Sequence, residues 1–361
     1  MKVFQDNQIY LLQRFGGISR YFVELNEALV SLDSHDLFEI NAPVHFNAHL
    51  RQKRGIRGYI PFSTDLLRFN QLIRKVSDVE SIRNIEKINP DIIHETYYRN
   101  FDPWPESVPR VTTIHDLIRE KIDVDQSKIL KKLNSIKHSR KIICISENTK
   151  MDLMDYYPFI QESQISVIYF GVNRSIFNDE FSGRKKNQIV YVGQRSGYKN
   201  FHVLLEAFKR SKKLRQELKL IVFGGGPFSR LENEFINSNG LSSFVENIQG
   251  NDEKLINLYR ESIAMVYTSI YEGFGSPVLE SMSSGCVVLA NNTPALKEAG
   301  GSCAIYFDTR DVESLVFELE NLFSTTEKIE ELRKLGIERA KSFTWEKTAQ
   351  LTKMVYEDIL N

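Results

Sequence analysis

Three cysteines, balanced charge and short apolar runs limit what this 361-residue chain can be. The cysteines are odd in number and lack paired spacing, so we expect buried thiols in a reducing compartment. Basic and acidic residues number 47 each, so no charge excess favours a nucleic-acid partner. No apolar run approaches the roughly 20 residues that span a bilayer. The N-terminus lacks the apolar core of a signal peptide, so we expect a cytoplasmic protein that can still touch a membrane surface.

Several signatures of enzyme chemistry are also missing from the sequence. No group of His, Cys, Asp or Glu residues has the spacing of metal ligands, so we expect no metal cofactor. There is no Gly-x-Ser-x-Gly elbow of the kind that carries a nucleophilic serine. A Walker A loop is absent as well, because no glycine loop ends in Gly-Lys-Ser or Gly-Lys-Thr.

What the sequence does contain is an alternation of short apolar runs and helical patterns, typical of βαβ units and parallel sheets. The chain is longer than one core usually supports, so two α/β domains are expected, residues 1–170 and 171–343. Both halves are close to neutral, with 23 basic and 22 acidic residues up to Phe170 and 24 and 25 after it. The predicted strands are residues 2–4, 37–40, 91–94, 111–115, 142–146 and 165–172, then 188–193, 219–224, 244–248, 263–267, 287–290 and 304–307.

The most informative stretch is residues 271–282, which follow the predicted strand 263–267. Its loop contains Gly273 and Gly275, and Pro277 stands where a helix is expected to open. A strand, a glycine loop and a helix N-terminus together favour an anion site, because free backbone N–H groups point into the loop. Glu272 and Glu280 frame this site, and their separation suits two sugar rings better than one metal ion. A plain alternative is that both are solvated charges.

A second glycine loop, residues 193–200, also follows a predicted strand. It begins with Gly193 and carries Arg195 and Lys199, whose positive charges could hold a diphosphate and stabilise it as it leaves. The alternative is a solvated basic loop.

In the first half, Gly16 and Gly17 lie between a predicted strand and the predicted helix 18–32. A glycine loop in each domain could enclose a nucleotide, although a tight turn explains the pair equally well. His115 ends the strand 111–115, at the edge where open α/β sheets bind ligands. It could hydrogen-bond a substrate hydroxyl or a leaving phosphate, or be a structural histidine.

Two basic amphipathic stretches could lie on an anionic membrane, residues 51–75 and 128–141. Both could equally be core-facing helices with a solvated basic face.

Taken together, the motifs resemble the family 4 retaining glycosyltransferases of the two-domain GT-B type. The resemblance covers nearly the whole chain and rests on residues 15–22, 113–116, 146–149, 167–172, 191–200 and the Glu272-x7-Glu280 element. It implies two Rossmann-like β/α/β domains facing each other across a nucleotide-sugar cleft. The N-terminal domain would bind the acceptor and the C-terminal domain the donor, with the last helix, 344–361, packing back on the N-terminal domain.

The resemblance also implies roles for matching residues. Arg195 and Lys199 would bind the donor diphosphate, and Glu280 the nucleotide ribose. Glu272 and the backbone of Gly273, Phe274 and Gly275 would hold the donor sugar. Gly16 and Gly17 would let the N-terminal domain close on the phosphates, and His115 would lie beside the anomeric centre. Gly193 and Ser276 complete the predicted donor site, and Ser276 departs from the family pattern, which often has a larger apolar residue there.

The implied activity is metal-independent, retaining transfer of a hexose from a nucleotide-diphosphate sugar. The form of residues 193–200 resembles the subgroup that builds bacterial O-antigens and capsules, so the expected donor is GDP-mannose or a GDP-deoxyhexose, with UDP- and dTDP-sugars as alternatives. The acceptor would be a saccharide or lipid-linked oligosaccharide at the cytoplasmic face of the inner membrane. Rival functions are a nucleotide-sugar epimerase and a non-catalytic scaffold that binds sugar nucleotides.

Overall fold

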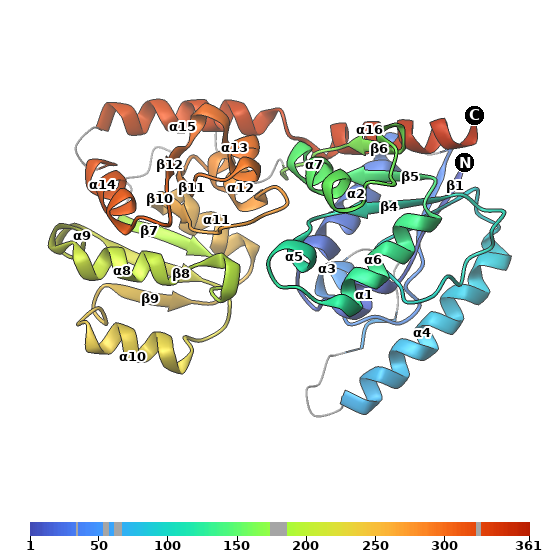
Figure 1. The fold of residues 1–361 in the computed structure, drawn as a ribbon, viewed down its shortest axis with the longest axis horizontal. Coiled ribbons are helices and arrows are strands. Elements are labelled where there is room, and N and C mark those ends of the chain that lie inside the picture. Colours follow the sequence, from blue (N-terminus) through green and yellow to red (C-terminus); the bar gives the residue numbers. More distant parts are fainter. Residues whose placement is uncertain (34, 53–57, 61–66, 174–185, 323–325) are drawn as a thin grey trace. The chain divides into compact units, whose positions relative to one another are not determined.

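The computed structural model describes residues 1–33, 35–52, 58–60, 67–173, 186–322 and 326–361, and it divides the chain into two compact units. The first unit comprises Met1–Gly171 and Trp345–Asn361, and the second comprises Val172–Thr344. Each contains one six-stranded sheet flanked by helices (Figure 1). The predicted α/β class with two Rossmann-like domains is therefore confirmed.

In the first unit the strand order is β2-β1-β3-β4-β5-β6, and all neighbours are parallel. The strands are β1 Lys2–Gln5, β2 Leu37–Ile40, β3 Ile92–Glu95, β4 Arg110–Ile114, β5 Lys141–Cys144 and β6 Ile165–Val167. The helices are α1 Gln8–Leu12, α2 Gly17–Leu32, α3 Ala48–Gln52, α4 Leu67–Ile88, α5 Ile118–Lys121, α6 Gln126–His138, α7 Glu147–Tyr156 and α16 Trp345–Leu360.

In the second unit the order is β12-β11-β10-β7-β8-β9, again parallel throughout. The strands are β7 Lys186–Val192, β8 Lys219–Phe223, β9 Val245–Ile248, β10 Ser262–Tyr267, β11 Val287–Asn291 and β12 Ile305–Phe307. The helices are α8 His202–Arg210, α9 Lys212–Glu217, α10 Arg230–Ser238, α11 Asp252–Glu261, α12 Ser276–Ser283, α13 Pro294–Gly300, α14 Val312–Leu322 and α15 Thr326–Lys341.

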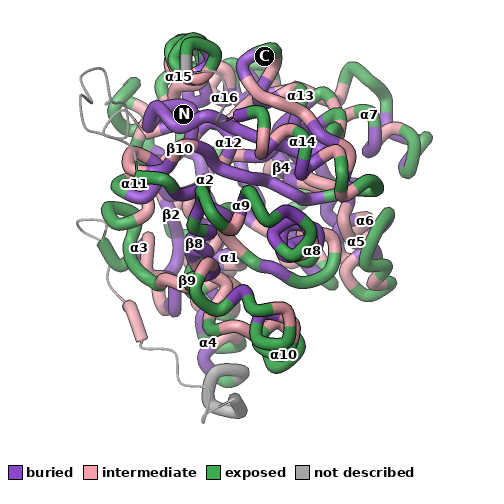
Figure 2. The backbone as a smooth tube through the Cα atoms, turned by 90° about the vertical axis from the view of Figure 1, so that its left-hand side faces the viewer, coloured by how far each residue is buried: buried purple, intermediate pink, exposed green. Residues whose placement is uncertain are grey.

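The sheets lie between helices, and central strands such as β3, β4 and β11 are buried on both faces, which explains why they read as apolar runs. Figure 2 shows the contrast between buried strands and helices with exposed outer faces. The final helix, α16, belongs to the first unit, where Val355 and Tyr356 join the core formed with Phe22 and Leu25 of α2. Tyr356 also forms a 2.7 Å hydrogen bond with Nδ1 of the buried His94 at the end of β3.

One strand is shorter than the sequence predicts. The apolar run 165–172 suggests a strand of that length, but β6 ends at Val167. Beyond it the chain contacts α16, where the carbonyl of Tyr169 accepts a 2.8 Å hydrogen bond from Thr348 Oγ1.

Local sequence accounts for where several helices begin. Ser146 caps α7 by accepting a 2.9 Å hydrogen bond from the Thr149 N–H, and Asn251 caps α11 in the same way. Helix α12 begins at Ser276, with Pro277 inside its first turn as the sequence suggests.

The strand orders place a topological switch point in each sheet, where ligands bind outside the carboxyl ends of α/β strands. In the second unit the order reverses between β7 and β10, and in the first between β1 and β3. The loops that follow these strands are therefore the places to look for a site.

Of the two stretches considered for membrane contact, the structure describes only one in full. Residues 53–57 and 61–66 of the stretch 51–75 lie outside the described residues, whereas the stretch 128–141 is described throughout. Of the helices that the structure describes, none combines the length and the apolar character needed to cross a bilayer.

Candidate functional site

The switch point of the second unit brings together the two loops that the sequence singled out. Residues 193–200 follow β7 and residues 268–275 follow β10, and these strands are neighbours. Two hydrogen bonds join the loops directly: the Ile270 N–H donates to the Tyr198 carbonyl at 2.9 Å, and Thr268 Oγ1 donates to the Lys199 carbonyl at 2.7 Å. The two loops therefore form one surface at the carboxyl edge of the sheet.

Lys199 and Glu272 form an ion pair across these loops. Lys199 Nζ lies 2.5 Å from Glu272 Oε1, and the two side chains are only 16% and 11% exposed. Although burial lowers the pKa of Lys199, the nearby Tyr267, Glu272 and Tyr198 hold it well above its ordinary value. The site thus contains a permanently charged ammonium beside a carboxylate.

The loop from Glu272 to helix α12 needs glycine at its last position. Gly275 has φ of 109°, and a Cβ there would lie 2.7 Å from Leu296 Cδ2. Phe274 is buried, and its ring contacts that of Phe343 at 5.8 Å between centroids. This contact anchors the loop to the rest of the unit. Ser276 then opens α12, and Glu280 lies one turn later with a partly exposed side chain. One carboxylate, that of Glu272, therefore precedes the helix N-terminus, and another, that of Glu280, lies inside the helix.

Arg195 lies in the same loop as Lys199 but points its guanidinium elsewhere. Nε donates to Glu232 Oε1 at 2.7 Å, Nη1 to the carbonyls of Gly224 and Gly226, and Nη2 to the Pro227 carbonyl and Glu232 Oε2. All five N–H groups of the guanidinium thus face protein acceptors. In this structure Arg195 holds the glycine turn after β8, and a phosphate would have to displace one of those acceptors.

The turn itself is built for close approach to Arg195. Gly225 has φ of 67°, and a Cβ there would lie 2.6 Å from the Gly193 carbonyl oxygen and 2.7 Å from Arg195 Nη1. Only glycine fits between the two loops. Gly193, at φ of 106°, lies on the other side of this contact.

The remaining predicted residues lie in the first unit. Gly16 and Gly17 form the start of α2, where Gln13 Oε1 accepts the Ser19 N–H at 3.1 Å. His115 follows β4, and its ring meets the edge of Tyr21 at 5.0 Å between centroids. Burial lowers the pKa of His115 to about 3, with a further contribution from Lys132. The imidazole is neutral, and its buried Nε2 has no hydrogen-bond partner among the described residues.

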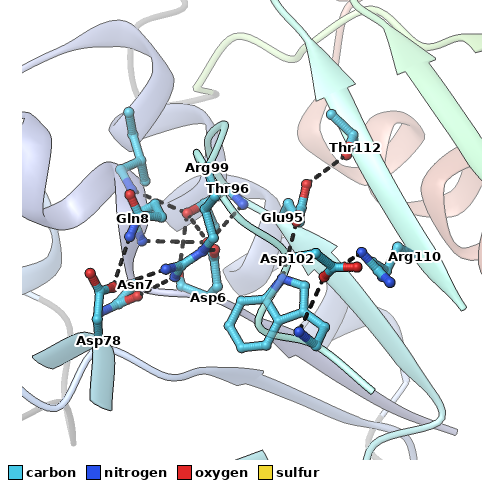
Figure 3. A network of polar contacts seen from close by, with 12 residues as sticks. Asp6, Asn7, Gln8, Asp78, Glu95, Thr96, Arg99, Asp102, Arg110 and Thr112 are labelled. Atoms are coloured by element: carbon cyan, nitrogen blue, oxygen red, sulfur yellow. Dashed lines mark hydrogen bonds and ion pairs between the residues drawn. The ribbon is translucent and has the colours of Figure 1, made fainter. Parts of the chain in front are cut away.

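Sequence reasoning missed a buried polar network at the switch point of the first unit (Figure 3). Arg99 Nε pairs with Asp6 Oδ2 at 3.0 Å, its Nη1 with Asp78 at 3.0 Å and its Nη2 with Asn7 at 2.7 Å. Thr96 donates to Asp6 from both its N–H and its hydroxyl. The only sequence signal is that Asp6 and Thr96 directly follow strands. The network therefore lies at the carboxyl ends of β1 and β3.

Two residues of the second unit, Tyr267 and Glu232, were missed as well. Tyr267 ends β10 and contacts both Lys199 and Glu272, while Glu232 lies in the first turn of α10 and pairs with Arg195. Within the described ranges, no three His, Cys, Asp or Glu side chains are grouped so as to hold a metal ion.

Comparison with known families matches both units. Residues 15–175 match the model "Glycosyltransferase Family 4", and residues 172–341 match "Glycosyl transferases group 1".

Individual relatives are distant and mostly partial. The chain is 29% identical over 226 residues to the MMP alpha-(1->4)-mannosyltransferase of Mycolicibacterium hassiacum, covering 60% of this chain and 54% of that protein. It is 28% identical over 193 residues to the O-antigen chain mannosyltransferase RfbU of Salmonella typhimurium, covering 52% of each. The chain thus matches about half the length of these two relatives. An uncharacterized glycosyltransferase of Methanocaldococcus jannaschii, MJ1178, is 26% identical over 99% of both chains.

Solved structures share the fold over the whole chain. Anabaena Alr3699/HepE, determined with UDP and glucose, superposes with a TM-score of 0.76 at 15% identity, covering 99% of this chain and 100% of that one. WaaG, a glycosyltransferase involved in lipopolysaccharide biosynthesis, gives a TM-score of 0.68 at 13% identity, covering 99% of both chains. The fold is therefore of the GT-B type. Since the two family models together take in residues 15–341, the chain is a glycosyltransferase with a Family 4 domain followed by a group 1 domain.

Proposed function

We propose that the protein is a retaining hexosyltransferase that uses a nucleotide-diphosphate sugar, with GDP-mannose or a GDP-deoxyhexose as the first candidate donor. The acceptor is a hydroxyl of a growing, lipid-linked bacterial surface polysaccharide. Family membership and relatives named as mannosyltransferases, one of them for O-antigen chains, support the choice of reaction and sugar.

The observation that carries the proposal is the Lys199–Glu272 pair at the switch point of the second sheet. An ammonium can donate hydrogen bonds to a diphosphate, and a carboxylate can accept them from sugar hydroxyls. The pair therefore presents one group for each half of the donor. The start of α12 adds backbone N–H groups and the positive end of a helix dipole.

The other predicted residues take the following roles. Glu280 binds the ribose, and Gly273, Phe274, Gly275 and Ser276 line the sugar site through their backbone. Arg195 supports the diphosphate site with Gly193 by fixing the Gly224–Pro227 turn, a role that its contacts favour over direct phosphate binding. The roles of Gly16, Gly17 and His115 stay as the family resemblance implies. The imidazole of His115 is neutral, and its Nε2 is buried without a partner among the described residues, so hydrogen bonding to a sugar hydroxyl would require this atom to become accessible.

In the proposed reaction, the acceptor oxygen attacks the anomeric carbon on the face from which the diphosphate leaves. The bond between that carbon and the phosphate oxygen breaks, and the oxygen takes up the acceptor's proton. The products are the glycoside, with its configuration retained, and a nucleoside diphosphate. Lys199 lowers the barrier by stabilising the charge that develops on the leaving oxygen.

Turnover with a donor panel tests this function. Purified protein is incubated in EDTA with a lipid-linked saccharide and GDP-mannose, UDP-glucose or a dTDP-sugar, while nucleoside diphosphate release and the product's anomeric configuration are measured. We expect acceptor-dependent release from one donor and an α-linked product from an α-linked donor. A β-linked product would contradict retention, and loss of activity in EDTA would contradict metal independence.

Contact with an anionic membrane belongs to the same proposal, and it favours the helix α4, which shares only residues 67–75 with the first predicted stretch and extends beyond it. Its side chains Leu72, Val76 and Val79 are 57%, 54% and 48% exposed, while two serines, Ser77 and Ser81, face the core. Exposed Lys75 and Arg83 lie on the same outer face and complement anionic lipid. On α6 the apolar residues Ile129 and Ile136 are instead buried, so that helix uses its apolar face for the core.

Vesicle binding tests this surface. We expect the protein to co-sediment with phosphatidylcholine vesicles containing phosphatidylglycerol, and Val76→Asp to weaken this binding about five- to tenfold, since it adds a repelled charge. Leu130→Asp on α6, where the native side chain is 61% exposed, is the matched control and should bind like the wild type. Equal losses in both variants would show that α4 is not the contact surface.

A further inference from the structure

Tyr267 lies where the two loops of the donor site meet. It is the last residue of β10, and its ring is buried. Its hydroxyl donates to Glu272 Oε1 at 2.9 Å and accepts from Lys199 Nζ at 3.2 Å. Lys199 Nζ also lies 5.3 Å from the centroid of the Tyr267 ring and 5.1 Å from that of Tyr198. Tyr267 therefore contacts both charged groups at once.

These hydrogen bonds leave one donor and one acceptor available to a ligand. Lys199 has three N–H groups, of which one is directed at Glu272 and one at Tyr267. Both bonds to the Glu272 carboxylate reach Oε1, and Oε2 has no hydrogen bond to any described residue. One ammonium N–H and one carboxylate oxygen thus remain, side by side and held in fixed relation.

Without the Tyr267 hydroxyl, the side chains of Lys199 and Glu272 would be less firmly fixed relative to each other. A lysine side chain has four rotatable bonds, and fixing it costs rotamer entropy that a single partner offsets poorly. Two aromatic rings near the ammonium and a hydroxyl that bridges to the carboxylate restrict the ammonium to one place. Since Tyr267 is only 2% exposed, we expect it to act on a ligand through the two residues that it holds.

We propose that Tyr267 is a positioning residue that joins Lys199 to Glu272, so that the diphosphate and the sugar of the donor are recognised as one unit. This inference rests on the proposed function, and it adds that recognition of the two halves is coupled. A ligand with a diphosphate binds more tightly because the ammonium is fixed in place. A ligand that also has the sugar gains further affinity from the fixed carboxylate. A nucleoside monophosphate benefits from neither.

Tyr267→Phe tests the inference, because it removes only the hydroxyl and keeps the packed ring. Affinities are measured by calorimetry for a nucleoside monophosphate, the matching diphosphate and the diphosphate sugar. We expect unchanged binding of the monophosphate, about tenfold weaker binding of the diphosphate and a still larger loss for the diphosphate sugar. The matched control is Tyr306→Phe, which removes another hydroxyl of the same unit, one that donates to the Gly301 carbonyl at 2.8 Å. It should leave all three affinities unchanged.

Two results would overturn the assignment. If Tyr267→Phe binds diphosphate and diphosphate sugar like the wild type, the hydroxyl positions nothing. If it loses all three ligands equally, or no longer folds, the hydroxyl serves the stability of the unit and not ligand recognition. Failure of the proposed function looks different, because then the wild-type protein itself would bind no nucleoside diphosphate.

Discussion

Lys199→Ala is expected to remove transfer activity while the protein stays folded. The substitution takes away the ammonium that stabilises the leaving diphosphate, and losing one such preorganised group lowers kcat by about 10²–10³-fold. It also leaves the Glu272 carboxylate, 11% exposed, without its cation, so diphosphate binding should weaken through added repulsion. Steady-state kinetics with the preferred donor, together with a melting curve, measure both effects.

The matched control is Lys186→Ala. Lys186 also forms a 2.6 Å ion pair in the second unit, with Glu261, but it is 61% exposed and lies at the opposite end of β7. That variant should keep wild-type kinetics, because an exposed pair of this kind contributes little. If Lys199→Ala turned over the donor like the wild type, Lys199 would not belong to the site. The main support for the proposed donor would then be lost.

The largest effect on stability is expected at Arg99. Its side chain is 2% exposed and that of its partner Asp6 is fully buried, so Arg99→Met leaves a buried carboxylate without its counter-charge, although the two hydrogen bonds from Thr96 remain. Breaking a buried pair in this way costs about 3–5 kcal/mol of unfolding free energy. Further loss comes from the bonds to Asn7 and Asp78 and from the guanidinium over the Trp104 ring at 4.8 Å. Denaturant unfolding of the purified protein measures the change.

An exposed ion pair provides the comparison. Arg230 pairs with Glu234 at 2.7 Å on α10, but its side chain is 89% exposed, so Arg230→Met should leave the unfolding curve unchanged. If Arg99→Met unfolds at the same denaturant concentration as Arg230→Met, the network does not stabilise the first unit. Activity does not enter this test, because no catalytic role is assigned to Arg99.

The sequence predicted those parts of the molecule that depend on local pattern. Strand β8, which is buried from Leu220 to Phe223, appears as an apolar run and was predicted with one residue too many. Strand β2 was predicted to the residue, although Leu37 is exposed and Glu39 interrupts its apolar run. Glycine loops after strands marked residues 193–200 and 271–276, because positive φ and close approach need glycine. The end of β6 was missed, because the chain beyond it contacts Thr348, which is far away in the sequence.

Contacts between distant residues could not be read in this way. Arg195 looked like a free cation, but its partner Glu232 lies 37 positions away on a helix whose direction only the packed sheet defines. Arg99 and Asp6 are separated by 93 positions and meet because β1 and β3 are neighbours. Tyr267 looked like the apolar end of a strand, and only the pairing of β7 with β10 brings its hydroxyl to Lys199. The pattern gave candidate residues, and strand order decided which of them meet.

The central claim is that the second unit holds a nucleoside diphosphate without metal, and a thermal-shift screen tests it most directly. The protein is melted in EDTA with GDP, UDP, ADP and dTDP, each beside its monophosphate. We predict that one diphosphate raises the melting temperature well above its monophosphate, since saturation at 100 times Kd stabilises by about 2.7 kcal/mol. A selective shift with GDP would support the proposed donor, and one with UDP or dTDP would change the donor but keep the site. No shift with any diphosphate, in a protein that melts cooperatively, would contradict the account.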